Sequence, residues 1–103
     1  MRAEGQAHID RIEAALALVR QSLDWDRALR RLDELNARVE DADLWNDPKQ
    51  AEAIMRERRR LDASIGTVKE IGQEMADAVE FVELGEAEGD DATVQEGLDS
   101  LAR

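Results

Sequence analysis

Apolar residues recur along most of the chain at the alternating three- and four-residue spacing of an amphipathic helix. The first stripe consists of Ile9, Ile12, Leu16, Val19 and Leu23. The second consists of Trp25, Ala28, Leu32, Leu35 and Val39. These stripes predict helices over residues 4–22 and 25–40. Asp24 stands where its carboxylate can cap the second helix.

The longest stripe repeats every seven residues, through Ile54, Leu61, Val68, Met75 and Val82, with Ile65, Ile71 and Val79 in the intervening turns. A seven-residue period is typical of helices that pack along one another at a shallow angle. It predicts one long helix over about residues 48–84, ended by Gly85 in a left-handed conformation. Gly66 and Gly72 weaken this helix and indicate either a bend or a close helix contact.

A short final stripe of Val94, Leu98 and Leu101 predicts a helix over residues 91–102, which Asp90 or Asp91 can cap. The four segments together predict an all-α fold, an antiparallel three- to four-helix bundle in which residues 1–103 form one helical domain. The last stripe is still apolar on one face where the chain reaches Arg103. We therefore expect the chain to be a fragment of a larger multidomain protein.

The clearest break in the helical pattern is the segment Asp41–Pro48, which contains the one proline and one of the two tryptophans. Asp47 can cap the long helix with its side-chain oxygen, and Pro48 fits the first helical position, where a missing N–H costs nothing. A large indole in a polar turn usually folds back onto the helices that it joins, so Trp45 is expected to pack there. Trp25 is expected to be a second anchor of the core.

Acidic residues outnumber basic ones by 25 to 14, and the excess is concentrated in one half of the chain. Eleven acidic residues and no Lys or Arg lie between residues 70 and 102. Such a face, with no compensating cation, repels nucleic-acid phosphate and anionic membranes, which argues against DNA and membrane partners. It favours a basic protein partner, with Glu83, Glu86 and Glu88 as candidate contacts, or simply a solvated surface.

The residues that usually carry catalysis are scarce in this chain. It has no Cys and a single histidine, His8, so neither a disulfide nor a conventional metal site is expected. It has no Gly-rich phosphate loop and no nucleophile–histidine arrangement, so no catalytic residue and no cofactor are expected. No segment approaches the roughly 20 apolar residues of a membrane span, so a cytoplasmic protein is the default.

The one dense basic cluster is the segment Arg56-Glu57-Arg58-Arg59-Arg60. Its side chains face several directions around the predicted helix, so they cannot all bind one ligand. We expect most of the arginines to pair with acids on neighbouring helices, and Arg58, near the seam, to be partly buried. The alternative is that Arg56, Arg59 and Arg60 contact RNA phosphate or the carboxylates of a protein partner.

Two stretches of the chain carry a resemblance to a known family. The first is Leu23-Asp24-Trp25-Asp26, followed by a charged amphipathic helix. The second is Asp43-Leu44-Trp45-Asn46-Asp47-Pro48, followed by Ala51, Arg56-Glu57 and Leu61. In this order they resemble the N-terminal domain of bacterial peptide chain release factor 2, over about residues 22–101. Ala42 stands where the family often has proline, which loosens the turn but leaves Trp45 and the cap in place.

The resemblance implies that the parent protein is a class 1 factor that directs termination at UGA and UAA codons. The family's Ser-Pro-Phe tripeptide, which reads the codon, and its Gly-Gly-Gln loop, which triggers peptidyl-tRNA hydrolysis, are both missing here. The domains that contact mRNA and peptidyl-tRNA would therefore lie elsewhere in the parent, and this fragment would not itself be an enzyme. The implied partners are the ribosome, at the large-subunit GTPase-associated centre and ribosomal protein L11, and the class 2 release factor.

Two other interpretations fit an acidic, all-helical chain. One is a generic helical bundle or coiled-coil protein-interaction module. The other is a helical chorismate mutase, in which several arginines grip a dicarboxylate. Against the mutase, the longest helix is predicted third rather than first, and the arginines of the basic cluster are too widely spread to converge. Only the release factor requires a Ser-Pro-Phe and a later Gly-Gly-Gln in the parent chain.

Overall fold

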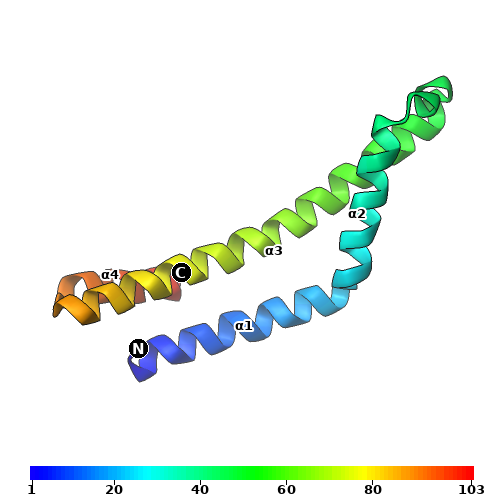
Figure 1. Ribbon diagram of the computed structural model, residues 1–103. Helices are drawn as coiled ribbons and strands as arrows, with labels where there is room; N and C mark the ends of the chain where they lie inside the picture. Colours follow the sequence, from blue (N-terminus) through cyan, green and yellow to red (C-terminus); the bar gives the residue numbers. More distant parts are fainter. The chain divides into compact units, whose positions relative to one another are not determined.

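The computed structural model describes residues 1–103 and consists of four α-helices and one short 3₁₀ helix, without strands (Figure 1). The helices are α1 (Ala3–Leu23), α2 (Trp25–Glu40), α3 (Pro48–Glu88) and α4 (Asp91–Ala102), and the 3₁₀ helix η1 (Ala42–Asn46) joins α2 to α3. The prediction of an all-α fold with one long helix is confirmed. None of the helices combines the length and the apolarity that crossing a membrane requires.

The chain folds as two compact units that interleave along the sequence. The terminal unit comprises Met1–Val19 and Lys69–Arg103, and the central unit comprises Arg20–Val68. The first half of α3 belongs to the central unit and the second half to the terminal unit. Each unit has buried apolar side chains of its own, one cluster in the central unit and two in the terminal unit.

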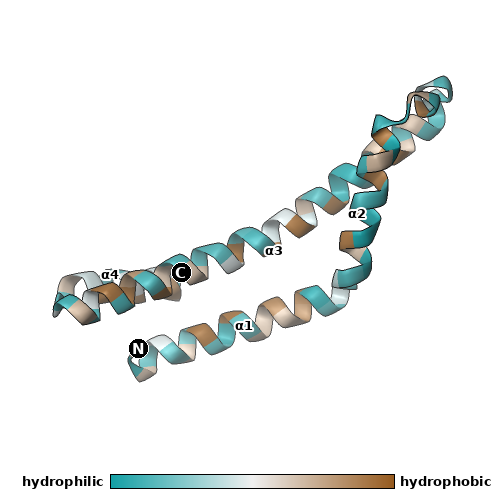
Figure 2. Ribbon diagram, viewed as in Figure 1, coloured by the Kyte–Doolittle hydropathy of each residue, from teal (hydrophilic) through white to brown (hydrophobic).

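In the central unit, α2 and the first half of α3 form an antiparallel hairpin with η1 at its closed end (Figure 1). The core of this hairpin consists of Leu35, Leu44, Ala51 and Ile54, with Val39 and Leu61 packed against it. Figure 2 shows that the rest of α2 is mostly hydrophilic, as expected for a helix that buries one narrow stripe.

In the terminal unit, α1 and α4 both run antiparallel to the second half of α3 (Figure 1). One core cluster joins the three helices through Ile9, Ala78 and Leu101. A second cluster joins α3 to α4 through Val82, Val94 and Leu98. The final apolar stripe of the sequence is therefore buried within this unit, against α3.

Gly97 allows α4 to approach α3 closely. A Cβ atom at this position would overlap Cγ2 of Val82 and would lie 3.4 Å from the backbone oxygen of Ala78. Gly66 and Gly72, which the sequence suggested as a close helix contact, have no atom within 4 Å of where a Cβ would stand. That alternative is wrong for both. Gly97 is at a close helix contact, and so are Gly5, beside Leu98, and Gly85, beside Thr93 and Val94.

The end of α3 differs from the prediction. The helix continues past Leu84 to Glu88, and Gly89, rather than Gly85, takes the left-handed conformation, with φ of 67°. The N–H of Asp90 donates to the oxygen of Gly85 (2.9 Å) and the N–H of Gly89 donates to that of Glu86 (3.2 Å), which is the Schellman pattern. Gly85 is inside the helix, where a Cβ would lie 2.9–3.1 Å from the side chain of Thr93.

The junction between α1 and α2 is a single residue, Asp24, which has a left-handed backbone with φ of 52°. Aspartate is one of the few residues besides glycine that visit this region readily. The prediction that Asp24 caps α2 with its carboxylate is wrong, since its side chain makes no capping hydrogen bond. The residue separates the two helices through its backbone conformation instead.

Two apolar positions of the predicted stripes are exposed. Val19 is 44% exposed and Ile71 is 41% exposed, so the expectation that they face a core is wrong. Three residues correspond to about 300° around a helix, which places Val19 about 60° from Leu16 and Ile71 about 60° from Val68. Leu16 and Val68 are buried, so the two exposed side chains lie at the flank of each stripe rather than at its centre.

Candidate interaction surfaces

The turn between α2 and α3 is held in place by hydrogen bonds on both sides. At its start, the Asp41 carboxylate accepts the N–H of Asp43 (2.9 Å), and the Asp41 carbonyl accepts the N–H of Leu44 (3.1 Å). At its end, the Asp47 carboxylate accepts the N–H of Gln50 (3.3 Å), which confirms the predicted cap of α3. Leu44 fixes the middle of the turn, because its side chain is only 4% exposed and packs in the core of the central unit.

Trp45 does not fold back onto the helices that it follows and precedes, so that prediction is wrong. Its side chain is 54% exposed, while its neighbour Leu44 is buried. Successive residues of a 3₁₀ helix point about 120° apart, so η1 can direct only one of the two into the core. The exposed acids Glu40, Asp41, Asp43 and Asp47 stand before and after Trp45, and no Lys or Arg lies between residues 40 and 48. Trp45 and these four acids are called the Trp45 tip below.

Trp25, the other expected anchor, is half-buried at the start of α2. The guanidinium carbon of Arg20 lies over its ring, 5.7 Å from the centroid, in a cation–π arrangement. The indole is thus sheltered by a neighbouring cation and contributes to the junction between α1 and α2. It offers less accessible apolar surface to a partner than Trp45 does.

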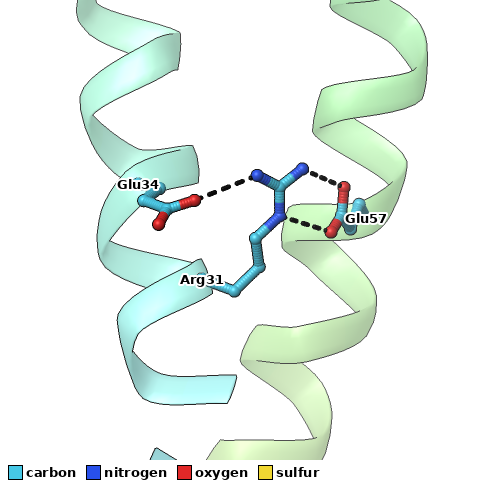
Figure 3. Close-up of polar contacts among 3 residues, drawn as sticks. All are labelled: Arg31, Glu34 and Glu57. Carbon is cyan, nitrogen blue, oxygen red and sulfur yellow. Dashed lines mark hydrogen bonds and ion pairs between the residues drawn. The ribbon is translucent and has the colours of Figure 1, made fainter. Parts of the chain in front are cut away.

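A three-residue ion network joins α2 to α3 (Figure 3). Arg31 donates through Nε and Nη2 to the two carboxylate oxygens of Glu57, at 2.7 and 2.9 Å, and through Nη1 to Glu34 at 3.1 Å. Hydrogen bonding to Glu57, and then to Glu34, raises the pKa of Arg31 above its usual range. The bond from Arg31 likewise lowers the pKa of the Glu57 carboxyl. A bidentate pair fixes the relative register of the two helices more firmly than a single bond does.

The basic cluster is arranged differently from the expectation. Arg56 pairs with Glu52 on its own helix (2.9 Å), so pairing with a neighbouring helix is wrong for this residue. Arg58 is half-buried as predicted, but it donates to the amide oxygen of Asn36 (2.7 Å) rather than to an acid. Arg59 and Arg60 are exposed and form no ion pair. Within the cluster, only Glu57 makes an ion pair with another helix.

Two adjoining surface hollows lie along α2 and α3 in the central unit. The larger, about 540 Å³, is lined by Arg27, Arg30, Arg31, Glu34 and Glu57. The smaller, about 380 Å³, adds Arg60 to this surface. Arg31 is bound by two carboxylates, whereas Arg27, Arg30 and Arg60 form no ion pair. These three arginines keep their hydrogen-bond donors for solvent or for an anionic partner; the sequence pattern missed Arg27 and Arg30.

Two of the acids on the surface of the terminal unit are paired with cations, which the sequence did not indicate. The amino group of Met1 lies 3.3 Å from the carboxylate of Glu86, and Arg2 lies 3.5 Å from Asp91. The expectation that no cation compensates this face is therefore wrong, although Glu83 and Glu88 form no ion pair. The unit as a whole still carries fourteen acidic side chains against four basic ones.

The N-terminus of α4 shows what one of these acids does locally. The Asp90 carboxylate accepts both the hydroxyl proton of Thr93 (2.7 Å) and its backbone N–H (3.1 Å), which confirms Asp90 as the cap. These bonds, the hydroxyl bond first, lower the pKa of Asp90. The groups with shifted pKa values thus belong to an ion network between two helices and to a helix cap.

The chain matches no protein-family model. It is 48% identical over 101 residues to "Peptide chain release factor 2" of Paramagnetospirillum magneticum and 46% identical over 101 residues to the protein of that name from Ruegeria sp.. Both alignments cover 98% of this chain and 27% of the relative. The corresponding protein of Phenylobacterium zucineum is 53% identical over 78 residues, covering 76% of this chain and 21% of the relative. The chain thus spans about a quarter of the length of the curated relatives that it matches.

Proposed function

The chain belongs to the peptide chain release factor 2 family and spans about a quarter of the length of the relatives that it matches. We therefore propose that it is the N-terminal part of a translation termination factor. The observation that carries this proposal is the 46–48% identity over nearly the whole chain. In the parent, we propose, other domains read UGA and UAA and trigger peptidyl-tRNA hydrolysis. The role of residues 1–103 is then to dock the factor on the ribosome in the cytoplasm.

The proposed docking site on the ribosome is the GTPase-associated centre of the large subunit, with ribosomal protein L11 and the class 2 release factor as further partners. The central unit is the better docking element of the two. It presents Arg27, Arg30 and Arg60 without ion pairs, and it carries the Trp45 tip. The terminal unit, with fourteen acids against four basic residues, is repelled by ribosomal RNA phosphate and suits a basic protein surface or solvent.

The arrangement of the arginines along α2 and α3 fits a role in binding a partner better than it fits catalysis by a chorismate mutase. A mutase needs several guanidinium groups that converge on one small dicarboxylate. Arg31, which lines the larger hollow, already donates two hydrogen bonds to Glu57 and a third to Glu34. A turnover assay with chorismate provides a direct check, and catalysis of its rearrangement by this chain would contradict the proposal.

The proposal is tested with ribosomes programmed with UGA or UAA in the decoding site. The full-length parent should release the nascent peptide, the chain of residues 1–103 alone should behave as buffer does, and the parent lacking residues 1–103 should associate more slowly. Codon-dependent release by residues 1–103 alone would overturn the division of labour. Unchanged association of the shortened parent would overturn the docking role.

The orientation of docking is tested separately by charge reversal in the full-length parent. Replacing Glu83, Glu86 and Glu88 by lysine should slow association with the ribosome if the acidic face meets a basic protein, more so at low salt. It should change little if that face is only solvated. Faster and tighter binding would place the face against RNA and would contradict the orientation proposed here.

A further inference from the structure

The Trp45 tip presents a large apolar side chain on a turn whose core contact is made by a different residue. Leu44 supplies the buried contact of η1, and the carboxylates of Asp41 and Asp47 satisfy backbone donors at both ends of the turn. The indole of Trp45 remains 54% exposed. A single exposed apolar residue is ordinary on a protein surface, and Leu18, at 67%, is one such residue on α1. Trp45 differs from Leu18 in its larger, amphipathic side chain and in the carboxylates around it, and its turn is held by hydrogen bonds at both ends.

Fixed support matters because ordering a flexible loop opposes binding, whereas a preformed turn has already lost that freedom. Tryptophan is also, with tyrosine and arginine, one of the residue types enriched among the side chains that dominate protein–protein affinity, typically in well-packed pockets. The α2–η1–α3 turn therefore has the two attributes of an anchor, which are a large amphipathic side chain and a rigid base.

The charges around the indole indicate the kind of partner. Four carboxylates, from Glu40, Asp41, Asp43 and Asp47, stand within the same short segment, and the first cation after them is Lys49. RNA phosphates would be repelled by this arrangement, and stacking of Trp45 on a nucleobase would bring the backbone of the RNA close to the carboxylates. A protein surface rich in Lys and Arg, with an apolar slot between the cations, is complementary to it.

We propose that the Trp45 tip is a protein-docking site, in which Trp45 enters an apolar slot on a basic ribosomal protein and the four acids pair with the cations around that slot. The proposal rests on the ribosomal role argued above, because it seeks the partner on the ribosome. It goes beyond that role in assigning the contact to one side chain and to the four carboxylates around it.

Photo-crosslinking identifies the partner directly. The full-length parent, carrying a benzophenone amino acid in place of Trp45, is bound to purified 70S ribosomes with a stop codon in the decoding site and irradiated. The expected result is a crosslink to a basic ribosomal protein. A matched variant with the same group in place of the exposed Leu18 should give a weaker crosslink or a different one. A crosslink from position 45 to ribosomal RNA, or none above the level given by unbound factor, would overturn the proposal.

Affinity measurements test the same contact without a bulky probe. Trp45→Ala in the full-length parent should raise the Kd for programmed ribosomes at least tenfold, while Leu18→Ala should leave it within about twofold. Asp43→Asn removes a charge whose carboxylate makes no hydrogen bond, and it should slow association, with the difference shrinking as salt rises. The melting temperatures of the three variants should stay close to that of the wild type, because none of these side chains is buried.

The outcomes separate this inference from the proposed function. If the wild-type parent fails to bind and act on programmed ribosomes, the proposed function is wrong. If the parent binds and acts normally but Trp45→Ala has the wild-type Kd, only the assignment of the tip is wrong. If Trp45→Ala weakens binding but also lowers the melting temperature by as much as a core substitution does, the side chain supports the fold and the docking role is refuted.

Discussion

Gly97→Ala should destabilise the chain, although alanine is the better helix former. In a helix interior, alanine is favoured over glycine by about 1 kcal/mol. At position 97 a steric overlap opposes this gain in helix propensity. The new Cβ would overlap Cγ2 of Val82 and lie 3.3 Å from the backbone N of the same residue. Val82 is fully buried and has a stiff, β-branched side chain, so it cannot turn away without disturbing its neighbours.

The expected magnitude follows from setting the two effects against each other. Forcing one extra carbon into a well-packed contact typically costs about 1–3 kcal/mol. After the gain in helix propensity, the free energy of unfolding should fall by up to about 2 kcal/mol. Gly66→Ala provides the matched control, because no atom lies within 4 Å of where its new Cβ would stand and the same propensity should stabilise it by about 0.5–1 kcal/mol. The difference between the two variants isolates the overlap.

Thermal unfolding followed by circular dichroism, with urea titration as a second measure, resolves this difference. For a chain of this size, 1 kcal/mol corresponds to a shift in melting temperature of about 4–8 °C. Gly66→Ala should melt above the wild type and Gly97→Ala at or below it. If Gly97→Ala stabilises the chain as much as Gly66→Ala does, α4 does not pack against Val82 at the distance described, and the reasoning about the terminal unit is refuted.

Three further predictions concern the turn and the caps. Leu44→Ala should lower the free energy of unfolding by about 2–5 kcal/mol, as is usual for a buried leucine, whereas Trp45→Ala should lower it far less. Equal losses for the two variants in denaturant titrations would contradict the burial described. Asp47→Ala should lower the free energy of unfolding by about 0.5–2 kcal/mol through loss of the cap of α3, and Asp47→Asn should retain most of that stability. If Asp47→Ala melted at the same temperature as the wild type, the cap would contribute nothing. Because the pKa of Asp90 is lower in the folded chain than its ordinary value of 3.8, its cap should stabilise α4 above about pH 4 and lose this effect as the pH falls through the folded pKa. The melting-temperature difference between wild type and Asp90→Ala should therefore shrink in acid, and a difference independent of pH would refute the ionic character of the cap.

The sequence pattern located most of the helices because local physics determines them. The seven-residue repeat from Ile54 to Val82 and the cap and proline at Asp47 and Pro48 describe short-range geometry, and the structure has the long helix starting where they place it. The end of α3 was harder to predict, since both Gly85 and Gly89 can end a helix. In the structure the left-handed residue is Gly89, whereas Gly85 lies where Thr93 of α4 packs closely, and such proximity between helices is not written in a local pattern.

The interaction surfaces were less predictable than the fold for the same reason. Whether Trp45 or Leu44 enters the core depends on the phase of a five-residue 3₁₀ helix, and both residues are apolar enough to be chosen. Whether an arginine is paired depends on which carboxylate lies across from it on the neighbouring helix. Arg31 pairs with Glu57, which lies 26 positions later in the sequence. The acids before and after these residues do not decide between them, because Leu44 lies among the same acids and is buried.

The interleaving of the two units has a consequence for the order of folding during synthesis. The central unit is one uninterrupted stretch, Arg20–Val68, so its hairpin can close as soon as that stretch has emerged. The terminal unit needs both Met1–Val19 and Lys69–Arg103, so the packing of α1 begins only when the second half of α3 has been made and is complete only after α4. In that interval Ile9 lacks its partners Ala78 and Leu101 and remains open to solvent and to chaperones. Within residues 1–103, α4 therefore completes the packing of α1, and a ribosome that stalls within residues 69–103 would leave the apolar face of α1 exposed.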